Sequence, residues 1–416
     1  MDFFPHQRKY FLIFSLSFIP RFSYLSFYFK TLRTSGNPYW MQELLHRWRW
    51  TDGGMETSWY EPFYPLFLAV FRRLSGDQFF WVMMAQIGVS ALGTIFLYKL
   101  CVALTRESRV GLIAVFLYSF HPYLIRQSVG IIEVPLFMTL LIVASYYYLN
   151  TEKWRAAAGC GLALGLTILT RFVIFPVVLI GMGILLFKKR FRDAAILFLV
   201  VFVTAFPMFY RNFTLTGSIV PTRSGYNLFK GNCEYSDYVI PRYSVDVLGD
   251  YAFKTLQADG IKIKDTSETE VDRLFQQKAF RFMREHPWRT IRLKALNILY
   301  LFHPRLVPFY LCEESVQLKT GSDGSPMISG ASSRSLLVEA AYSVTHLFIF
   351  ITAIAGIYLR RRSIFREDIF LWVIVVSLTL IYAFYWPATR LRAPMDFVFI
   401  FYSAVALKPA FDRLKR

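Results

Sequence analysis

Long apolar stretches, separated by short polar and basic segments, dominate the hydrophobic pattern of this chain. Ten of them reach or approach the length of a membrane-spanning helix. They cover residues 10–29, 79–104, 109–125, 134–149, 156–170, 172–187, 193–210, 337–359, 368–386 and 394–408. Two long polar regions, residues 30–78 and 211–336, interrupt the series. The pattern therefore predicts an all-α polytopic integral membrane protein with about ten transmembrane helices and two large loops.

The basic residues indicate how such a protein is oriented. They cluster at residues 99–109, 153–155, 188–192, 360–366 and 408–416, which share one side if every apolar segment crosses. The positive-inside rule makes that side cytoplasmic, so both termini are inside and both loops extracytoplasmic. The predicted location is the inner (plasma) membrane. Residues 289–302 carry three basic residues and are predicted to form an interfacial helix instead of an eleventh crossing.

Composition agrees with this topology. The 416 residues are 55% hydrophobic and 18% aromatic, which is too apolar for a soluble protein of this length. The net charge of +19 would suggest nucleic acid in a soluble chain, but here the cytoplasmic loops account for most of it, so no nucleic-acid partner is predicted. We expect three parts: a seven-helix module at 1–210 containing the first loop at 30–78, a large loop at 211–336, and C-terminal membrane helices at 337–416.

The large loop contains one clear helix signal and two cysteines. Ser267 and Glu270 form a capping-box pattern that predicts an amphipathic helix over residues 267–286. Cys233 and Cys312 both fall in this loop. A disulfide between them and a pair of free thiols are both compatible with the sequence, because spacing alone does not show proximity.

Several cations lie at the expected outer ends of the apolar segments, where the positive-inside bias predicts few. They are Arg126, Arg171, Arg211, Arg223, Lys230, Arg390 and Arg392. Each alone is compatible with a side chain that reaches lipid headgroups. Together they are candidates for a phosphate-binding pocket, because a planar guanidinium group binds phosphate oxygens in pairs. Arg390 and Arg392, in the short turn WPATRLRAP, are the strongest candidates.

The stretch RNFTLTGSIVPTRSGYNLFKGN, residues 211–232, follows the seventh crossing directly. It combines cations with Gly, Asn, Thr and Ser, and it includes Asn227 and Asn232. Glycine-anchored turns of this composition suit the binding of an anionic, hydroxyl-rich ligand. We therefore expect these residues, with Glu133, to contribute to a substrate site at the membrane surface.

Carboxylates on the same side are candidates for acid–base chemistry. Glu61 lies among aromatic residues and prolines in SWYEPFYPLFLA, and Glu133 begins the fourth crossing. Removal from water raises the pKa of a carboxyl group towards that of a working base. The alternatives are a shielded loop residue for Glu61 and a charge that interacts with the helix dipole for Glu133. Asp52, in the polar run TDGGMET, is expected to be solvated. The six histidines are scattered and show no metal-ligand spacing. The sequence does not decide whether the protein requires a divalent metal.

Four stretches, EPFYPLFLA (61–69), SVGIIEVPLF (128–137), residues 211–232 and TRLRAPMD (389–396), carry a resemblance. The chain resembles a bacterial GT-C glycosyltransferase of the group related to protein O-mannosyltransferases and aminoarabinose lipid A transferases. The resemblance implies a module of seven membrane helices with the active site under the first loop. It also implies transfer of a sugar from a polyprenyl-phosphate carrier to an extracytoplasmic acceptor. Glu61 would correspond to the acidic residue that ends the first loop, and Arg390 and Arg392 would neighbour the carrier phosphate.

The chain departs from that family at one important position. The family usually places an Asp just after the first helix, a few residues before a Tyr. This sequence has Asn37 before Tyr39, and the next acidic residue is Glu43. An amide cannot act as a base, so Glu43, Asp52 or Glu61 carries that role, or the activity is altered or lost.

The predicted function is an inverting transferase in which a carboxylate, Glu61 first, activates the acceptor and arginines stabilise the leaving phosphate. The acceptor could be a protein, lipid A or a surface glycan, and membrane lipid is the other expected partner. Two alternatives stay open: a lipid-linked sugar flippase or transporter, and an O-antigen polymerase or ligase.

Overall fold

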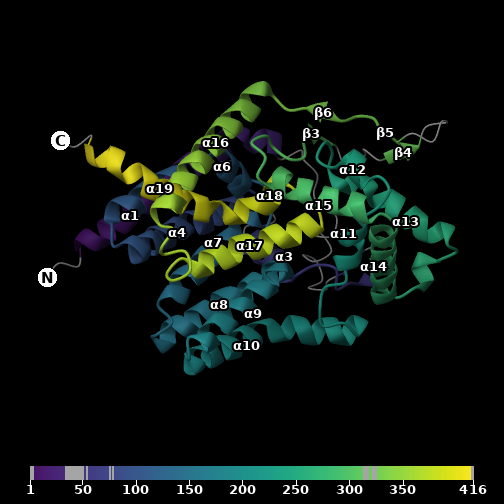
Figure 1. The fold of residues 1–416 in the computed structure, drawn as a ribbon, viewed down its shortest axis with the longest axis horizontal. Helices are drawn as coiled ribbons and strands as arrows, with labels where there is room; N and C mark the ends of the chain where they lie inside the picture. Colours follow the sequence, from purple (N-terminus) through teal and green to yellow (C-terminus); the bar gives the residue numbers. More distant parts are fainter. Residues whose placement is uncertain are drawn as a thin grey trace.

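The computed structural model describes residues 4–32, 51–52, 55–74, 76, 79–312, 318–320 and 326–413. Most of these residues are helical and form two parts: a bundle of apolar helices and a loop domain of residues 217–335 at one end of it (Figure 1). The bundle contains α1 (Phe4–Leu32), α3 (Phe63–Leu74), α4 (Phe79–Thr105), α5 (Ser108–Ser119), α6 (Pro122–Val129), α7 (Val134–Leu149), α8 (Trp154–Thr170), η1 (Phe172–Ile174), α9 (Phe175–Phe187), α10 (Phe191–Thr216), α16 (Leu336–Leu359), α17 (Ile369–Phe384), α18 (Thr389–Arg392), η4 (Ala393–Met395) and α19 (Asp396–Arg413).

The bundle confirms the predicted all-α polytopic membrane fold. Within the described part of the chain, five segments are long and apolar enough to cross a membrane: most of α1, α4, α10, α16 and the segment from α18 to α19. A sixth consists of α5 and α6, which are bent by 62° relative to each other. Four shorter apolar helices, α7, α8, η1 with α9, and α17, occupy the remaining predicted segments.

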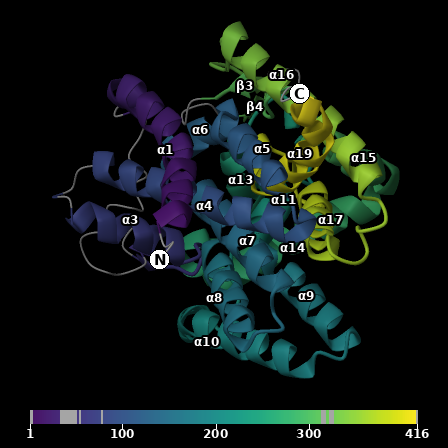
Figure 2. The same ribbon diagram turned by 90° about the vertical axis from the view of Figure 1, so that its left-hand side faces the viewer.

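The helices pack in three groups around α7. Figure 2 shows α1 beside α4, α5 and α6, with α8, α9 and α10 below them and α16, α17 and α19 to the right. Helix α10 illustrates how one helix serves both core and lipid: Leu197, Val201 and Ala205 are buried, whereas Phe198 and Phe202 are about half exposed on the other side. An apolar face of this kind suits contact with lipid.

Helix α1 begins and helix α19 ends at the bundle end opposite the loop domain (Figure 1). Ion pairs tie the helix ends together there: Lys408 Nζ lies 2.9 Å from a Glu107 oxygen, and Arg360 lies 2.7 Å from Asp368. This is the end that collects the basic clusters, so part of their charge is neutralised by carboxylates.

The loop domain is built from short helices over its own small core. These are α11 (Ser224–Lys230), α12 (Ser236–Val239), η2 (Val245–Leu248), α13 (Gly249–Ala258), η3 (Ile263–Asp265), α14 (Glu268–Glu285) and α15 (Pro287–Leu301). Ser267 Oγ accepts a hydrogen bond from the Glu270 amide at 3.3 Å and so caps α14, whose Val271, Phe275 and Ala279 are buried. Trp59 stacks on Tyr226 with centroids 5.4 Å apart, which joins the end of the first loop to this core.

Three antiparallel two-stranded pairs complete the described elements. They are β1 (Thr51–Asp52) with β2 (Met55–Glu56), β3 (Tyr310–Leu311) with β6 (Ser332–Ser333), and β4 (Leu318–Thr320) with β5 (Pro326–Ile328). Cys233 and Cys312 are free thiols, so the disulfide considered from the sequence is not formed.

Two glycines of residues 211–232, Gly225 and Gly231, lie where another part of the backbone packs directly against them. A Cβ on Gly225 would lie 2.0 Å from the Asp272 carbonyl oxygen, and one on Gly231 would lie 1.9 Å from the Tyr385 carbonyl oxygen. Only glycine permits these backbones to approach so closely. Gly217, at φ +69°, ends α10 in the left-handed region. Because α10 continues to this glycine, the first residues of the stretch are helical instead of loop.

Candidate active site

A cluster of two carboxylates and one guanidinium group lies where the ends of α3, α7 and α8 meet; we call Glu61, Glu133 and Arg171 the carboxylate cluster. Arg171 Nε lies 3.2 Å from Glu133 Oε1, and Arg171 Nη1 donates to the Tyr382 hydroxyl at 3.2 Å. Glu61 Oε1 accepts a hydrogen bond from the Phe172 amide at 2.9 Å. The end of α8 holds this cluster, because Arg171 leaves the helix in an extended conformation that directs the next amide towards Glu61.

The two carboxylates are in different environments. Burial raises the pKa of Glu61 above its ordinary value, although the Phe172 amide and the nearby Arg171 and Arg223 oppose the increase. Glu133 is engaged in the ion pair with Arg171. It occupies the N-cap position of α7 without a capping hydrogen bond. Glu61 is therefore the better placed of the two to exchange a proton.

A second group, the cation cluster, consists of Arg223, Lys230, Asp246 and Arg390. Lys230 Nζ lies 2.9 Å from Asp246 Oδ1, and Arg390 Nη2 lies 3.7 Å from Asp246 Oδ2. Two cations thus share one carboxylate. Arg223 contributes a third positive charge: it stacks on the Tyr60 ring at 5.0 Å and interacts electrostatically with Lys230. The cluster carries an excess of positive charge that suits an anionic ligand.

The ionisation of the cation cluster reflects its burial. Lys230 is 1% exposed, and burial lowers its pKa to about 8, with Asp246 opposing the change. Although burial alone would raise the pKa of Asp246, Lys230 and Arg390 hold that pKa well below its ordinary value. Arg223 also interacts with Glu61, and Arg390 with Tyr382, so the two clusters form one continuous charged region.

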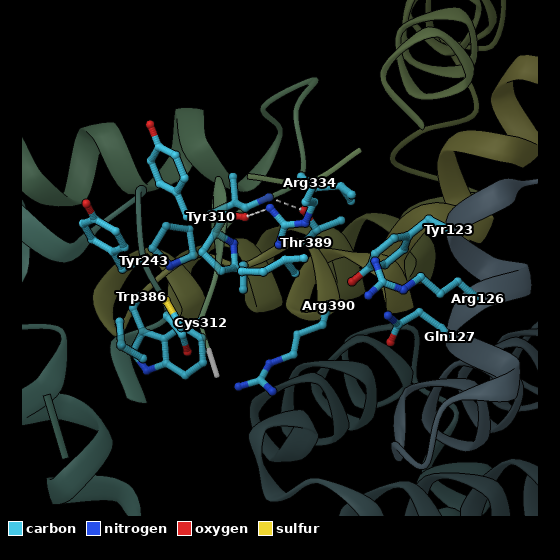
Figure 3. Close-up of a pocket in the computed structure, with 18 residues that line it drawn as sticks. Tyr123, Arg126, Gln127, Tyr243, Tyr310, Cys312, Arg334, Trp386, Thr389 and Arg390 are labelled. Carbon is cyan, nitrogen blue, oxygen red and sulfur yellow. Dashed lines mark hydrogen bonds between the residues drawn. The ribbon is translucent and has the colours of Figure 1, made fainter. Parts of the chain in front are cut away.

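A cavity of about 230 Å³ opens beside Arg390, between α6, the β3 segment and the connection from α17 to α18. Arg390 projects into this space, with Trp386 on one side and Arg126 and Gln127 on the other (Figure 3). Arg390 lies 5.5 Å from the Trp386 ring centroid, which supports its guanidinium group. Aromatic walls with a few polar groups are typical of small-ligand sites.

A third arginine, Arg334, lines the same cavity and was missed in the sequence analysis. It directly follows β6 and directly precedes Ser335, the N-cap residue of α16. The available signal was its position: like the other cations considered, it stands at the outer end of an apolar segment. The Ser- and Gly-rich sequence that precedes Arg334, residues 313–333, is typical of an ordinary loop and concealed this signal.

The structure places the other candidate residues elsewhere. Arg392 is fully buried and does not line the cavity: its Nε lies 3.0 Å from Asp396, and it donates to the Tyr342 hydroxyl at 2.6 Å. The expected contact of Arg392 with a carrier phosphate therefore finds no support in its placement. Arg211 donates to the Thr57 carbonyl and so anchors the end of the first loop.

The two asparagines of the 211–232 stretch lie on and just after α11. The buried Asn232 donates to the carbonyls of Leu228 at 2.9 Å and Phe384 at 3.2 Å, a structural role. Asn227 is half-buried on α11. Glu43 lies outside the described residues, and for Asp52 only the β1 backbone is described. Among the described residues, no group of three His, Cys, Asp or Glu side chains is arranged to hold a metal ion.

Residues 60–212 match the family of dolichyl-phosphate-mannose-protein mannosyltransferases. This segment carries Glu61, Glu133 and Arg171, and the match confirms the resemblance of the chain to mannosyltransferase-like membrane glycosyltransferases. No curated protein sequence matches the chain.

Two solved structures are similar over most of the chain. One is an Archaeoglobus fulgidus oligosaccharyltransferase in complex with Zn and sulfate, with a TM-score of 0.49 and 14% identity. The match covers 90% of this chain and 44% of that one, so the chain spans less than half the length of the archaeal protein. The other is ArnT from Cupriavidus metallidurans bound to undecaprenyl phosphate, with a TM-score of 0.34, 13% identity, and coverage of 86% of this chain and 71% of that one.

Proposed function

We propose that this protein is an inverting membrane glycosyltransferase that moves a sugar from a polyprenyl-phosphate carrier to an extracytoplasmic acceptor. The observation that carries the proposal is the junction of the two clusters: a half-buried carboxylate with a raised pKa, Glu61, adjoins an excess of cations around Arg390. A base beside a phosphate-binding site is what transfer from a phosphate-linked donor needs. The match of residues 60–212 to a mannosyltransferase family supports the same activity.

The proposed reaction is a single displacement. Glu61 takes the proton of the acceptor hydroxyl, whose oxygen forms a bond to the anomeric carbon of the sugar. The bond from that carbon to the carrier phosphate breaks, and its electron pair stays on the phosphate oxygen. Arg390 and Lys230 stabilise the charge that develops there. Because attack and departure occur on opposite faces of the carbon, the anomeric configuration inverts.

Other residues position these groups. Arg171 links Glu133 to the Tyr382 hydroxyl and so fixes the loop whose amide binds Glu61. Arg211 holds the end of the first loop through the Thr57 carbonyl. Glu43 and Asp52 remain candidates for a second acidic group, since the position of the family's usual first-loop Asp is occupied by Asn37.

The proposed location is the inner (plasma) membrane, with the site on the extracytoplasmic side. The basic clusters lie at the bundle end opposite the site, where the positive-inside rule places the cytoplasm. The acceptor classes compatible with this arrangement are a protein, lipid A and a surface glycan.

The proposal is tested by donor consumption in nanodiscs, with polyprenyl-phosphate-linked sugars and membrane extract as the source of acceptor. Nanodiscs enclose no second compartment, so transport by a flippase cannot imitate turnover. We expect the wild type to release the polyprenyl phosphate from one donor, and Arg390→Ala to do so far more slowly. Arg273→Gln, an exposed arginine on α14 paired with Glu270, is the control and should behave as wild type. Binding of a donor without release by the wild type would contradict the proposal and favour a flippase.

A further inference from the structure

Arg126 and Arg334 face the same cavity from elements that are distant in sequence, α6 and the start of α16 (Figure 3). They are close enough to repel each other: burial lowers the pKa of Arg334, and the charge of Arg126 lowers it further. Two like charges held together around a cavity are unfavourable unless an anion compensates them.

The described residues that line the cavity include no carboxylate to compensate this pair. Glu339 interacts with Arg334 at longer range, but Arg305 holds it through two hydrogen bonds of 2.9 and 3.3 Å. Arg334 donates through Nη1 to the Pro308 carbonyl, whereas its buried Nε has no hydrogen-bond partner among the residues that the structure describes. A buried guanidinium N–H without an acceptor is costly, and a phosphate or carboxylate oxygen would satisfy it.

Arg390 has a carboxylate counter-ion, whereas the described residues of the cavity lining supply none for the pair of Arg126 and Arg334. Arg390 shares Asp246 with Lys230, so it belongs to the cation cluster and faces the carboxylate cluster through Tyr382. Tyr123 interacts electrostatically with both Arg126 and Arg390, which line the same cavity. The cavity therefore presents two groups of positive charge: the Arg126–Arg334 pair, and Arg390 with its Asp246 counter-ion.

We propose that Arg126 and Arg334 form a second anion subsite, which binds a phosphate or carboxylate group other than the phosphate held at Arg390. The assignment of the first phosphate to Arg390 rests on the proposed function; the existence of the second subsite does not. The second anion has two sources of the same chemistry: a further phosphate on the carrier, or an acidic group on the other substrate.

The test measures equilibrium binding of radiolabelled inorganic phosphate to the full chain in nanodiscs, with and without saturating undecaprenyl phosphate. We expect phosphate to bind in the presence of the carrier. The double variant Arg126→Gln/Arg334→Gln should bind phosphate at least about tenfold more weakly, the scale of losing charge-assisted hydrogen bonds. Arg273→Gln should bind as wild type. Arg334→Lys, which retains the charge, should recover part of the affinity and show that the loss is not a folding defect.

Undecaprenyl diphosphate distinguishes the two sources. If the second anion belongs to the carrier, the diphosphate should bind more tightly than the monophosphate and displace inorganic phosphate. If it belongs to the other substrate, the diphosphate should bind like the monophosphate, and inorganic phosphate should remain bound. Either result supports the subsite.

Three results would overturn the subsite: no phosphate binding by the wild type, direct competition between phosphate and undecaprenyl phosphate, or equal phosphate binding by the double variant. Failure of the proposed function looks different. In that case the wild type would not bind undecaprenyl phosphate, or Arg390→Ala would bind it unchanged, while phosphate binding at Arg126 and Arg334 could still be measured.

Discussion

Replacement of Gly231 by alanine perturbs the site through the backbone and leaves every charged side chain in place. The added Cβ would lie 1.9 Å from the Tyr385 carbonyl oxygen, whereas real Cβ atoms stay at least 3.0 Å from such neighbours. The two backbones must therefore separate by about 1 Å. One of them follows directly on Lys230 and the other leads to Arg390, so the shift pulls apart the two cations that share Asp246.

The expected magnitudes follow from that displacement. Overpacking in a tight contact costs about 1–3 kcal/mol of stability. A misplacement of about 1 Å in catalytic groups costs about a hundredfold in rate. We therefore expect Gly231→Ala to lower the thermal unfolding midpoint modestly and to reduce donor turnover by about a hundredfold. The assays are tryptophan fluorescence on heating and release of undecaprenyl phosphate in nanodiscs.

Gly183→Ala is the matched control. A Cβ at Gly183, in α9, would meet no heavy atom within 4 Å, and alanine is favoured over glycine within a helix by about 0.5–1 kcal/mol. This variant should keep full turnover and equal or higher stability. Wild-type turnover by Gly231→Ala would refute the reasoning, because it would show that the spacing between these backbones does not set the geometry of the site.

Three further predictions concern single side chains. Arg390→Ala should raise the activation free energy by about 2–4 kcal/mol, the effect of losing one oxyanion donor, while expression stays intact. Near-normal initial rates in this variant would exclude a role of Arg390 at the phosphate. The pKa of Glu61 is raised, and the base must be ionised, so the rate should fall as pH decreases through a value above that of an ordinary glutamate. A pH–rate profile with no such acid limb would contradict this assignment. Asp272 accepts hydrogen bonds from the amides of Gly225 at 2.6 Å and Tyr226 at 3.3 Å, so Asp272→Ala should destabilise α11 by about 1–3 kcal/mol, seen as faster amide hydrogen exchange there.

The bundle could be predicted from the sequence because the physical signal is local. A membrane span needs a long run of apolar residues, and each run is visible without knowledge of its partners. The boundaries were less accurate: the seventh predicted segment ended at residue 210, whereas α10 continues to Thr216. The helix ends where Gly217 adopts a left-handed conformation, and a run of apolar residues gives no information about that position.

The candidate site could be predicted only in part from the sequence, because its residues come together from distant segments. Glu61 and Arg390 stood out in the sequence, since each is a charge in apolar surroundings, and their roles stay predictions. Arg334 was missed because the cavity it lines forms only when α6, the β3 segment and α18 meet. Arg392 does not line the cavity, and a local signal for its ion pair existed: Asp396 lies four residues later, the spacing of an ion pair on one helical face.

The packing role of the glycines could not be derived from the sequence. Gly231 is required by the carbonyl of Tyr385, and Gly225 by the carbonyl of Asp272, both distant along the chain. In the sequence these glycines are indistinguishable from those of a ligand-binding loop, because both uses depend on the absence of a side chain.

The most direct test of the account is release of undecaprenyl phosphate from its linked sugar by the wild type and by Glu61→Gln, side by side in nanodiscs with an acceptor extract. Glutamine keeps the shape of the side chain and can still accept the Phe172 amide hydrogen bond, but it cannot take a proton. The account predicts turnover by the wild type and a loss of at least about a hundredfold in the variant. Equal turnover by the two proteins would contradict the assignment of Glu61 as the base. Tight donor binding without turnover by either protein would contradict the proposed transferase activity. The replacement of the family's usual first-loop Asp by Asn37 would then be the explanation for the missing activity.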